Sequence, residues 1–361
     1  MKSIRTPLCD LFDIQVPILQ AGMGGVAYGR LAAAVSNAGG LGCIAAIDGT
    51  PETVEEEIRR FRQLSNKPLC VDIGFPRRAP TGLADVEVVD LPGPIKQLHK
   101  ELKALGVEVK PSHDQAMSIE DAKLKLDIAL SYGAEAIACA LGTPKWVVDT
   151  CHAKGTKVIG LVGRSRHVRS VMEAGADAVV VQGTEGGGHT GDVGLLALLA
   201  ETLSFTTIPV IAAGGIVNGA QIAAVLTQGA QGVWLGTRFL ASEESSAEDN
   251  FKAAVVEAGH DATVRTPIFD GLHIRSLRNR FIDAWDGHEN EMLGYPRQRL
   301  VTSPVRWAAS RANLKDYMNM PAGQGVGLVN ERESAAKILA QLVDETVAAL
   351  ESARERIRIG G

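Results

Sequence analysis

The chain has 361 residues, a formal net charge of −5, 45% hydrophobic residues and 22% charged residues. This composition is ordinary for a globular enzyme with a large core, and the lack of a basic stripe argues against nucleic acid or an anionic membrane as a partner. The first twenty residues do not resemble a signal peptide, and no stretch approaches the roughly 18–20 apolar residues of a transmembrane helix. We therefore expect a cytoplasmic protein whose partners are a small-molecule substrate and at most a second copy of the chain.

The five cysteines are scattered along the chain and include no C-x-x-C pair. Zinc sites and disulfide frameworks depend on defined spacings, which are missing here. We expect reduced thiols in strands or core positions and no metal site. The residues are Cys9, Cys43, Cys70, Cys139 and Cys151.

Eight short apolar, β-branched runs recur along the chain, each followed by a helical pattern. Nearly continuous hydrophobic strands are typical of a sheet covered on both faces, and alternation with helices indicates parallel strands. Eight such units close a barrel, whereas a doubly wound sheet usually stops near five or six. The pattern predicts an α/β protein with a (β/α)8 TIM barrel. The predicted strands are Val16–Gln20, Leu41–Ala46, Pro68–Ile73, Ala134–Ala140, Thr156–Val162, Ala176–Gln182, Ile208–Ala212 and Gln231–Leu235.

Several predicted helices carry start and stop signals. Thr50-Pro51-Glu52 offers a cap, a proline at the first position and an acidic first turn. Gly-Ala pairs precede three strands, and glycine suits the left-handed residue that ends a helix. The pairs are Gly133-Ala134, Gly175-Ala176 and Gly229-Ala230.

Two segments depart from the repeat. From Gly74 to about Ser118, five prolines interrupt the pattern, which predicts an extended loop after the third strand with a short helix around Pro94–Leu105. A long tail follows Phe239. We expect a barrel over residues 1–240, with its insertion at about 74–118, and an extension over 241–361 that packs on the barrel and forms part of a lid.

Within this tail we expect a helix near Glu243–Ala258, an irregular stretch to about Gly327 and a terminal helix from Glu331 to Arg356. The segment Ile274–Asn279 is basic. It is interpreted either as a contact for the pyrophosphate of NAD(P)H or coenzyme A, or as a solvated helix face.

Three predicted strands run directly into glycine-rich loops, which share one end of a barrel. Loops seven and eight form the usual phosphate site of such barrels, where bare backbone N–H groups hold an anion. The alternative is that these glycines only make tight turns, and the pairing alone does not identify the phosphate compound. The candidate residues are Ala21, Gly22 and Met23 after strand one, Ala213, Gly214 and Gly215 after strand seven, and Gly236 and Thr237 after strand eight.

The first of these loops narrows the choice of ligand. Ala21-Gly22-Met23 brings backbone and a polarisable side chain against something flat, such as a flavin ring across the barrel mouth. Met23 taken alone is more typical of a core residue that fills a gap.

Strand six leads into a loop that carries His189, the one histidine of eight embedded in a glycine-rich strand-end loop. A histidine there can take or give a proton near neutral pH, and Gly187 and Gly188 can turn backbone N–H groups toward the cofactor or substrate. The alternative is a histidine that only hydrogen-bonds the loop. Gln182 and Asp72, at the ends of strands six and three, are candidate hydrogen-bond partners for the cofactor.

Two further polar residues, one in the tail and one in this loop, bear on the same site. His273 in the tail is a weaker candidate for reaching the same site. Glu185 is interpreted as a solvated loop carboxylate.

Five segments together resemble the nitronate monooxygenase family, whose superfamily also includes flavin-dependent enoyl-thioester reductases and an NADH:quinone reductase. They are PILQAGMGG, AVSNAGGLG, VVVQGTEGGGHTG, IPVIAAGGI and GTRFLAS. The resemblance covers about residues 5–75 and 130–245 and implies an FMN-binding barrel. It implies that His189 is catalytic, that the isoalloxazine lies against Ala21-Gly22-Met23, and that the phosphate lies at Gly214-Gly215 and Gly236-Thr237.

The sequence departs from the family pattern on the substrate side. Asp72 stands where many relatives have asparagine, and strand five ends in Gly160-Leu161-Val162 where some have a His-Lys pair. The histidine loop reads GGGHTG where many have AGGH. The cofactor is therefore better supported than the substrate.

Two reactions fit this resemblance. A nitronate monooxygenase oxidises alkyl nitronates with O2 to a carbonyl compound and nitrite, with His189 binding the anion or deprotonating a nitroalkane. An enoyl-thioester reductase uses NAD(P)H as co-substrate, with His189 stabilising or protonating the enolate. A third hypothesis, a flavin-free phosphate-binding isomerase, lacks an acid–base carboxylate or lysine placed as well as His189.

Overall fold

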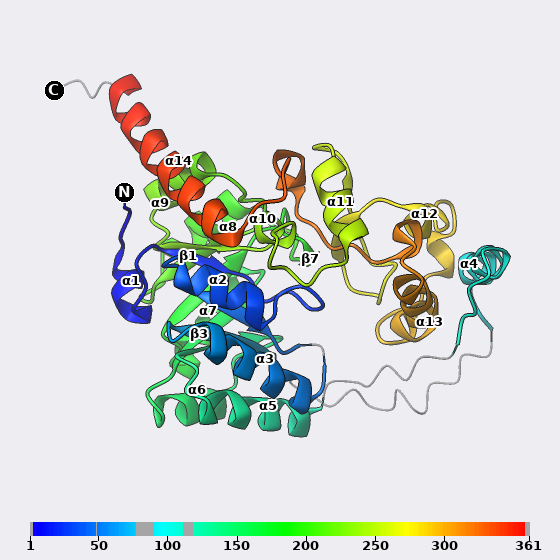
Figure 1. Cartoon of the computed structure of the whole chain (residues 1–361), viewed down its shortest axis with the longest axis horizontal. Helices are drawn as coiled ribbons and strands as arrows, with labels where there is room; N and C mark the ends of the chain where they lie inside the picture. Colours follow the sequence, from blue (N-terminus) through cyan, green and yellow to red (C-terminus); the bar gives the residue numbers. More distant parts are fainter. Residues whose placement is uncertain (1–2, 48, 77–89, 111–117, 358–361) are drawn as a thin grey trace.

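The computed structural model describes residues 3–47, 49–76, 90–110 and 118–357. Eight parallel strands form one sheet in the order β1-β9-β8-β6-β5-β4-β3-β2, and a parallel bridge between Leu19 and Leu41 closes it. The predicted (β/α)8 TIM barrel is confirmed, and every predicted strand is present with bounds that differ by at most two residues at either end (Figure 1). The strands are β1 Ile18–Gln20, β2 Gly42–Ala45, β3 Leu69–Gly74, β4 Ala136–Ala140, β5 Lys157–Val162, β6 Ala178–Gln182, β8 Val210–Ala213 and β9 Gly232–Leu235.

Helices surround this sheet and produce two apolar layers. The larger layer lies between strands and helices, and the smaller fills the barrel interior, where Leu8 and Phe12 of α1 (Pro7–Phe12) join inward-facing strand residues. All five cysteines are buried and free. The surrounding helices are α2 Gly29–Asn37, α3 Pro51–Leu64, α5 Ile119–Ser131, α6 Lys145–His152, α7 Ser165–Ala174, α8 Leu195–Leu203 and α9 Gly219–Gln228.

The expected helix signals are confirmed. The side chain of Thr50 accepts a hydrogen bond from the Thr53 N–H at the start of α3. The three glycines of the Gly-Ala pairs have left-handed φ angles, 68° at Gly133, 88° at Gly175 and 119° at Gly229. These local signals therefore determine where each helix begins or ends, and so where the following strand can start.

Gly42 lets α2 lie directly on β2. A Cβ at this position would overlap the backbone carbonyl of Ala32. We expect Gly42→Ala to lower the free energy of unfolding by about 2 kcal/mol or more, because backbone cannot yield as a flexible side chain does. Gly294→Ala is the matched control, since its added Cβ would meet no atom within 4 Å. Urea unfolding followed by circular dichroism measures both, and equal midpoints for the two variants would contradict the packing argument.

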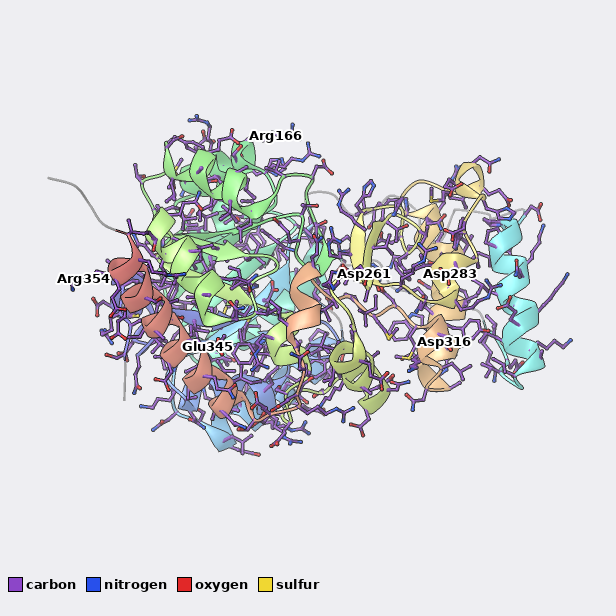
Figure 2. All side chains as sticks on the ribbon, turned by 90° about the horizontal axis from the view of Figure 1, so that it is seen from above. Arg166, Asp261, Asp283, Asp316, Glu345 and Arg354 are labelled. Atoms are coloured by element: carbon purple, nitrogen blue, oxygen red, sulfur yellow. The ribbon has the colours of Figure 1, made fainter. Side chains whose placement is uncertain are left out.

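The tail returns to the barrel through its last helix, α14 (Ala335–Arg356), which packs against α9 and α2. Glu345 lies on α14 (Figure 2), and its side chain accepts a hydrogen bond from the Gly219 N–H at 2.8 Å. Near the start of α14, Arg238 forms a buried ion pair with Glu333 at 3.0 Å. Before it, α11 (Asp249–Glu257) is shorter than the helix expected over 243–258.

A side lobe formed by α4 (Gly93–Ala104), α12 (Arg280–Asp283) and α13 (Arg297–Arg311) lies beside the barrel (Figures 1 and 2). Its apolar core includes Phe269 and Phe281, whose stacked rings are 5.3 Å apart. The expected insertion helix is α4, and it packs on the tail, with Glu101 paired to Arg280.

The expectation of an irregular stretch to about Gly327 is wrong, because this part of the tail contains α13 and two strands. The 15-residue α13 has Pro304 in its interior and buries the polar side chains of Gln298, Thr302 and Ser303. A proline and buried polar residues both argue against a helix in the sequence. Contacts with the rest of the lobe stabilise it, including a hydrogen bond from Gln298 to the Ile268 carbonyl.

A second, antiparallel sheet joins the tail to the loop after β6. Its strands are β10 (Thr263–Thr266), β11 (Ile274–Leu277) and β7 (Gly188–His189), in the order β10-β11-β7. His189 therefore lies on a short strand paired with the tail rather than in a free loop. In the described ranges, no helix is long and apolar enough to cross a membrane.

Candidate active site

The loop after β8 carries two adjacent backbone amides suited to an anion. Gly214 and Gly215 have φ angles of 109° and 72°, which glycine adopts without strain. Within the described chain, neither N–H donates to a protein acceptor. Buried or half-buried amides of this kind are nearly always paired, so two neighbouring free ones at a strand end are suited to a phosphate.

The loop after β9 continues this surface. Thr237 begins the short helix α10 (Thr237–Leu240), and its hydroxyl accepts a hydrogen bond from the Gly323 N–H at 2.8 Å. Gly236 lies against the first loop, where a Cβ would be 3.4 Å from the Met23 sulfur. The predicted residues after β1, β8 and β9 are thus brought to one end of the barrel.

Asp72 at the end of β3 lies under the first loop. A Cβ on Gly22 would overlap its carboxyl group, so glycine is needed for this approach. The side chain is buried, and its Oδ1 has no hydrogen-bond partner among the described residues. Burial raises the pKa of Asp72 from 3.8 to about 7, because the charged form loses its solvation. A protonated Asp72 can donate a hydrogen bond to a ligand at the mouth, much as the asparagine of many relatives would.

This shift predicts a pH-dependent stability. Between the unfolded value of 3.8 and the folded value of about 7, only the unfolded chain loses this proton, so stability falls as pH rises. We expect Asp72→Asn to remove a penalty of up to about 4 kcal/mol that is complete above pH 7 and absent below pH 4. Thermal unfolding of the flavin-free protein at about pH 4 and about pH 8 measures it. A variant with the same pH dependence as the parent chain would show that Asp72 titrates normally.

His189 is held by contacts on both sides of its strand. Register pairs it with Ile274 of β11, and the Gln182 side-chain amide donates to the His189 carbonyl at 3.0 Å. Its side chain is 52% exposed, and Nε2 lies 2.7 Å from Oδ2 of Asp270. The carboxyl of Asp270 is almost completely buried.

The ionisation of Asp270 reflects opposing effects. Burial alone would raise its pKa. The hydrogen bond and charge of His189, the Leu272 N–H and the charge of Arg306 outweigh burial and hold the pKa of Asp270 below its ordinary value. Asp270 is therefore a carboxylate at neutral pH.

A cavity of about 970 Å³ opens beside His189, over the carboxyl ends of β3 to β6. Its walls are largely apolar and include Phe75, Trp146 and Leu161. The glycines of the loops after β8 and β9 do not line this cavity, so these two loops and the cavity are separate parts of the mouth.

The rim of the cavity is polar. Arg164 and Arg265 both form ion pairs with Asp192, and His167 and His273 line the same rim. His273 thus lines the cavity, although in the sequence it was only a weaker candidate for this site. His167 also does so, although its sequence context suggested a plain surface residue.

Two interpretations of the sequence need correction. The segment Ile274–Asn279 is largely a strand: Arg275 is buried and donates to the Thr184 carbonyl, and Arg278 pairs with Asp283 and Asp286. The segment is therefore not a solvated helix face. Glu185 is not a solvated carboxylate, because both of its oxygens accept the Leu195 N–H at the start of α8.

Sequence reasoning missed Asp270, Arg265 and the turn at Gly323. All three come from the tail, whose local pattern gave no sign of strands or of a turn against the barrel. They reach the mouth through the pairing of β11 with β7 and through the contact of Gly323 with Thr237.

Comparisons with known proteins agree with this architecture. The chain belongs to the nitronate monooxygenase family, whose model matches residues 5–345. A probable nitronate monooxygenase of Bacillus subtilis is 33% identical over 351 residues, covering 93% of this chain and 97% of that protein. The protein is accordingly a flavin-dependent oxidoreductase.

Two solved structures are similar over nearly the whole chain. Nitroalkane oxidase from Streptomyces ansochromogenes has a TM-score of 0.83 and 35% identity, covering 96% of this chain and 99% of that one. FabK from Thermotoga maritima has a TM-score of 0.79 and 29% identity, covering 98% and 100%.

Proposed function

We propose that the protein is an FMN-dependent nitronate monooxygenase that oxidises alkyl nitronates with O2 to a carbonyl compound and nitrite. The observation that carries the proposal is the placement of His189, paired with a buried carboxylate, on the wall of an apolar cavity beside two free backbone amides. Bound FMN would supply the redox chemistry of the reaction as the electron acceptor for the nitronate.

The residues present fit this cofactor. The free amides of Gly214 and Gly215 suit its phosphate, and the orphaned Oδ1 of Asp72 suits a polar edge of its ring. We propose that the whole set of predicted residues binds FMN. These are Ala21, Gly22, Met23, Asp72, Gln182, Gly187, Gly188, Ala213, Gly214, Gly215, Gly236 and Thr237.

The protein's own chemistry centres on His189. Its imidazole lines the cavity, where it can bind the nitronate anion when protonated or take a proton from a neutral nitroalkane. Apolar side chains such as those of Phe75 and Trp146 line the cavity beside the imidazole and suit the alkyl part of the substrate.

A second candidate is an enoyl-thioester reductase that uses NAD(P)H, and the cavity favours keeping it. About 970 Å³ with apolar walls accommodates a substrate longer than a small nitroalkane, and the arginines of the rim suit a phosphorylated group.

Anaerobic mixing of the purified yellow protein with a nitronate, NADH or NADPH separates the candidates. We expect a nitronate to bleach the flavin absorbance and the nicotinamides to leave it nearly unchanged. Fast bleaching by NADH or NADPH would instead support the reductase. A colourless protein would contradict both and favour the flavin-free isomerase.

A further inference from the structure

We propose that Asp270 is a positioning residue for His189: its carboxylate holds the imidazole in one tautomer and orientation, so that Nδ1 takes the proton of a nitroalkane. This inference rests on the proposed function. It starts from the 2.7 Å contact between Nε2 of His189 and Oδ2 of Asp270.

The contact determines which ring nitrogen carries the proton. An ionised carboxylate only accepts hydrogen bonds, so Nε2 of His189 must donate and hold its hydrogen. Nδ1 then has a free lone pair. Among the described residues no group binds Nδ1, and the ring lies on the cavity wall.

Asp270 is held rigidly by the side lobe. Its Oδ1 accepts the Leu272 N–H at 2.8 Å, and the carbonyl of the preceding Phe269 is bound by Thr302 and Arg306 of α13. Gly271 has φ 89° and packs so closely on Tyr295 that a Cβ would overlap its backbone. The carboxylate cannot move away without disturbing the lobe, so it fixes the ring.

The charge of Asp270 decides whether His189 binds a nitronate anion or takes a proton from a nitroalkane. With Asp270 ionised behind it, a neutral imidazole presents a net negative pair, which disfavours binding an anion. After proton uptake, the imidazolium and the buried carboxylate form a stabilised ion pair. In the proposed step, the C–H bond next to the nitro group breaks and its proton goes to Nδ1. Its electron pair forms the C=N bond of the nitronate, while the π pair of the nitro N=O bond moves onto that oxygen.

Three arginines are the other charged groups near the His189–Asp270 pair. Arg306 faces Asp270 from α13, while Arg265 of β10 is engaged by Asp192 and Thr190, and Arg275 of β11 by Thr184. Asp270 is therefore the carboxylate that bonds the ring.

Turnover of a neutral nitroalkane and of its preformed nitronate by Asp270→Asn tests the proposal. We expect kcat for the nitroalkane to fall at least about 100-fold, while kcat for the nitronate changes by less than about fivefold, because only the first substrate needs a base. The asparagine keeps the size and the acceptor for the Leu272 N–H. An equal loss with both substrates would mean a merely structural role and would overturn the proposal.

A second measurement does not depend on the reaction. Proton NMR of the histidine-labelled protein should show a protected downfield Nε2–H signal that disappears in Asp270→Asn and in His189→Ala. Its persistence in Asp270→Asn, or its absence from the parent protein, would refute the pairing. If the signal behaves as expected and neither nitro compound is turned over, the proposed function fails while the pairing stands.

Glu291→Gln is the matched control. It removes the carboxylate from another histidine pair with the same 2.7 Å distance, His288–Glu291, in the side lobe. We expect kcat for both substrates to stay within about twofold of the parent protein.

Discussion

Replacing His189 with alanine is expected to lower turnover of a nitroalkane by about 100-fold to 10,000-fold while FMN stays bound. The imidazole is the proton acceptor proposed on the cavity wall, and the variant removes the partner of Asp270 Oδ2. The proposed phosphate contacts lie on the loops after β8 and β9, so their amides are unaffected. Steady-state rates and the ratio of flavin to protein measure the two effects separately.

His288→Ala is the control for this experiment. His288 is 47% exposed against 52% for His189, and each histidine lies 2.7 Å from a carboxylate oxygen. It lies in the side lobe, so we expect normal turnover. Full activity of His189→Ala would refute the catalytic role, whereas loss of flavin from it would show that the loop after β6 is needed for loading.

Gly214→Ala is expected to weaken FMN binding at least about tenfold. The added Cβ lies 3.0 Å from the Gly183 carbonyl and the residue must keep a φ of 109°, so the loop shifts and its free amides turn away from the phosphate. The loss of one amide–phosphate hydrogen bond alone costs about 1–3 kcal/mol. Titration of the flavin-free protein with FMN, followed by flavin fluorescence, gives the dissociation constant.

The matched control for this substitution is Gly229→Ala. Its φ is 119° and its Cβ meets a Leu203 methyl at 3.2 Å, so the backbone strain is similar, but it lies at the end of α9 away from the mouth. We expect both variants to lose similar stability and only Gly214→Ala to lose FMN. Equal affinity in the two variants would place the phosphate elsewhere.

The barrel and its glycine-rich loops could be predicted because their signals are local. Each strand is a short apolar run buried on both faces, and glycines with left-handed φ angles, such as Gly175 and Gly229, end the preceding helices. In a parallel barrel all carboxyl strand ends meet on one side, so Gly22, Gly214 and Gly236 were brought together by topology alone.

The side lobe could not be predicted in the same way. Pro304 and the buried polar side chains of α13 are not typical of a helix, so the sequence did not predict one there. Packing within the lobe stabilises this helix. The helix α4 comes from the insertion after β3 but packs on the tail, which local patterns do not encode.

The sequence by itself determined the barrel and the histidine in the loop after the sixth strand, because apolar periodicity and glycine spacing act over a few residues. The flavin family followed from the resemblance of its motifs. Only the tertiary structure decided which carboxylate faces that histidine, since Asp270 is 81 residues away. A two-residue strand, β7, has no periodicity to detect, and its pairing with β11 gains stability only when the tail folds back on the barrel.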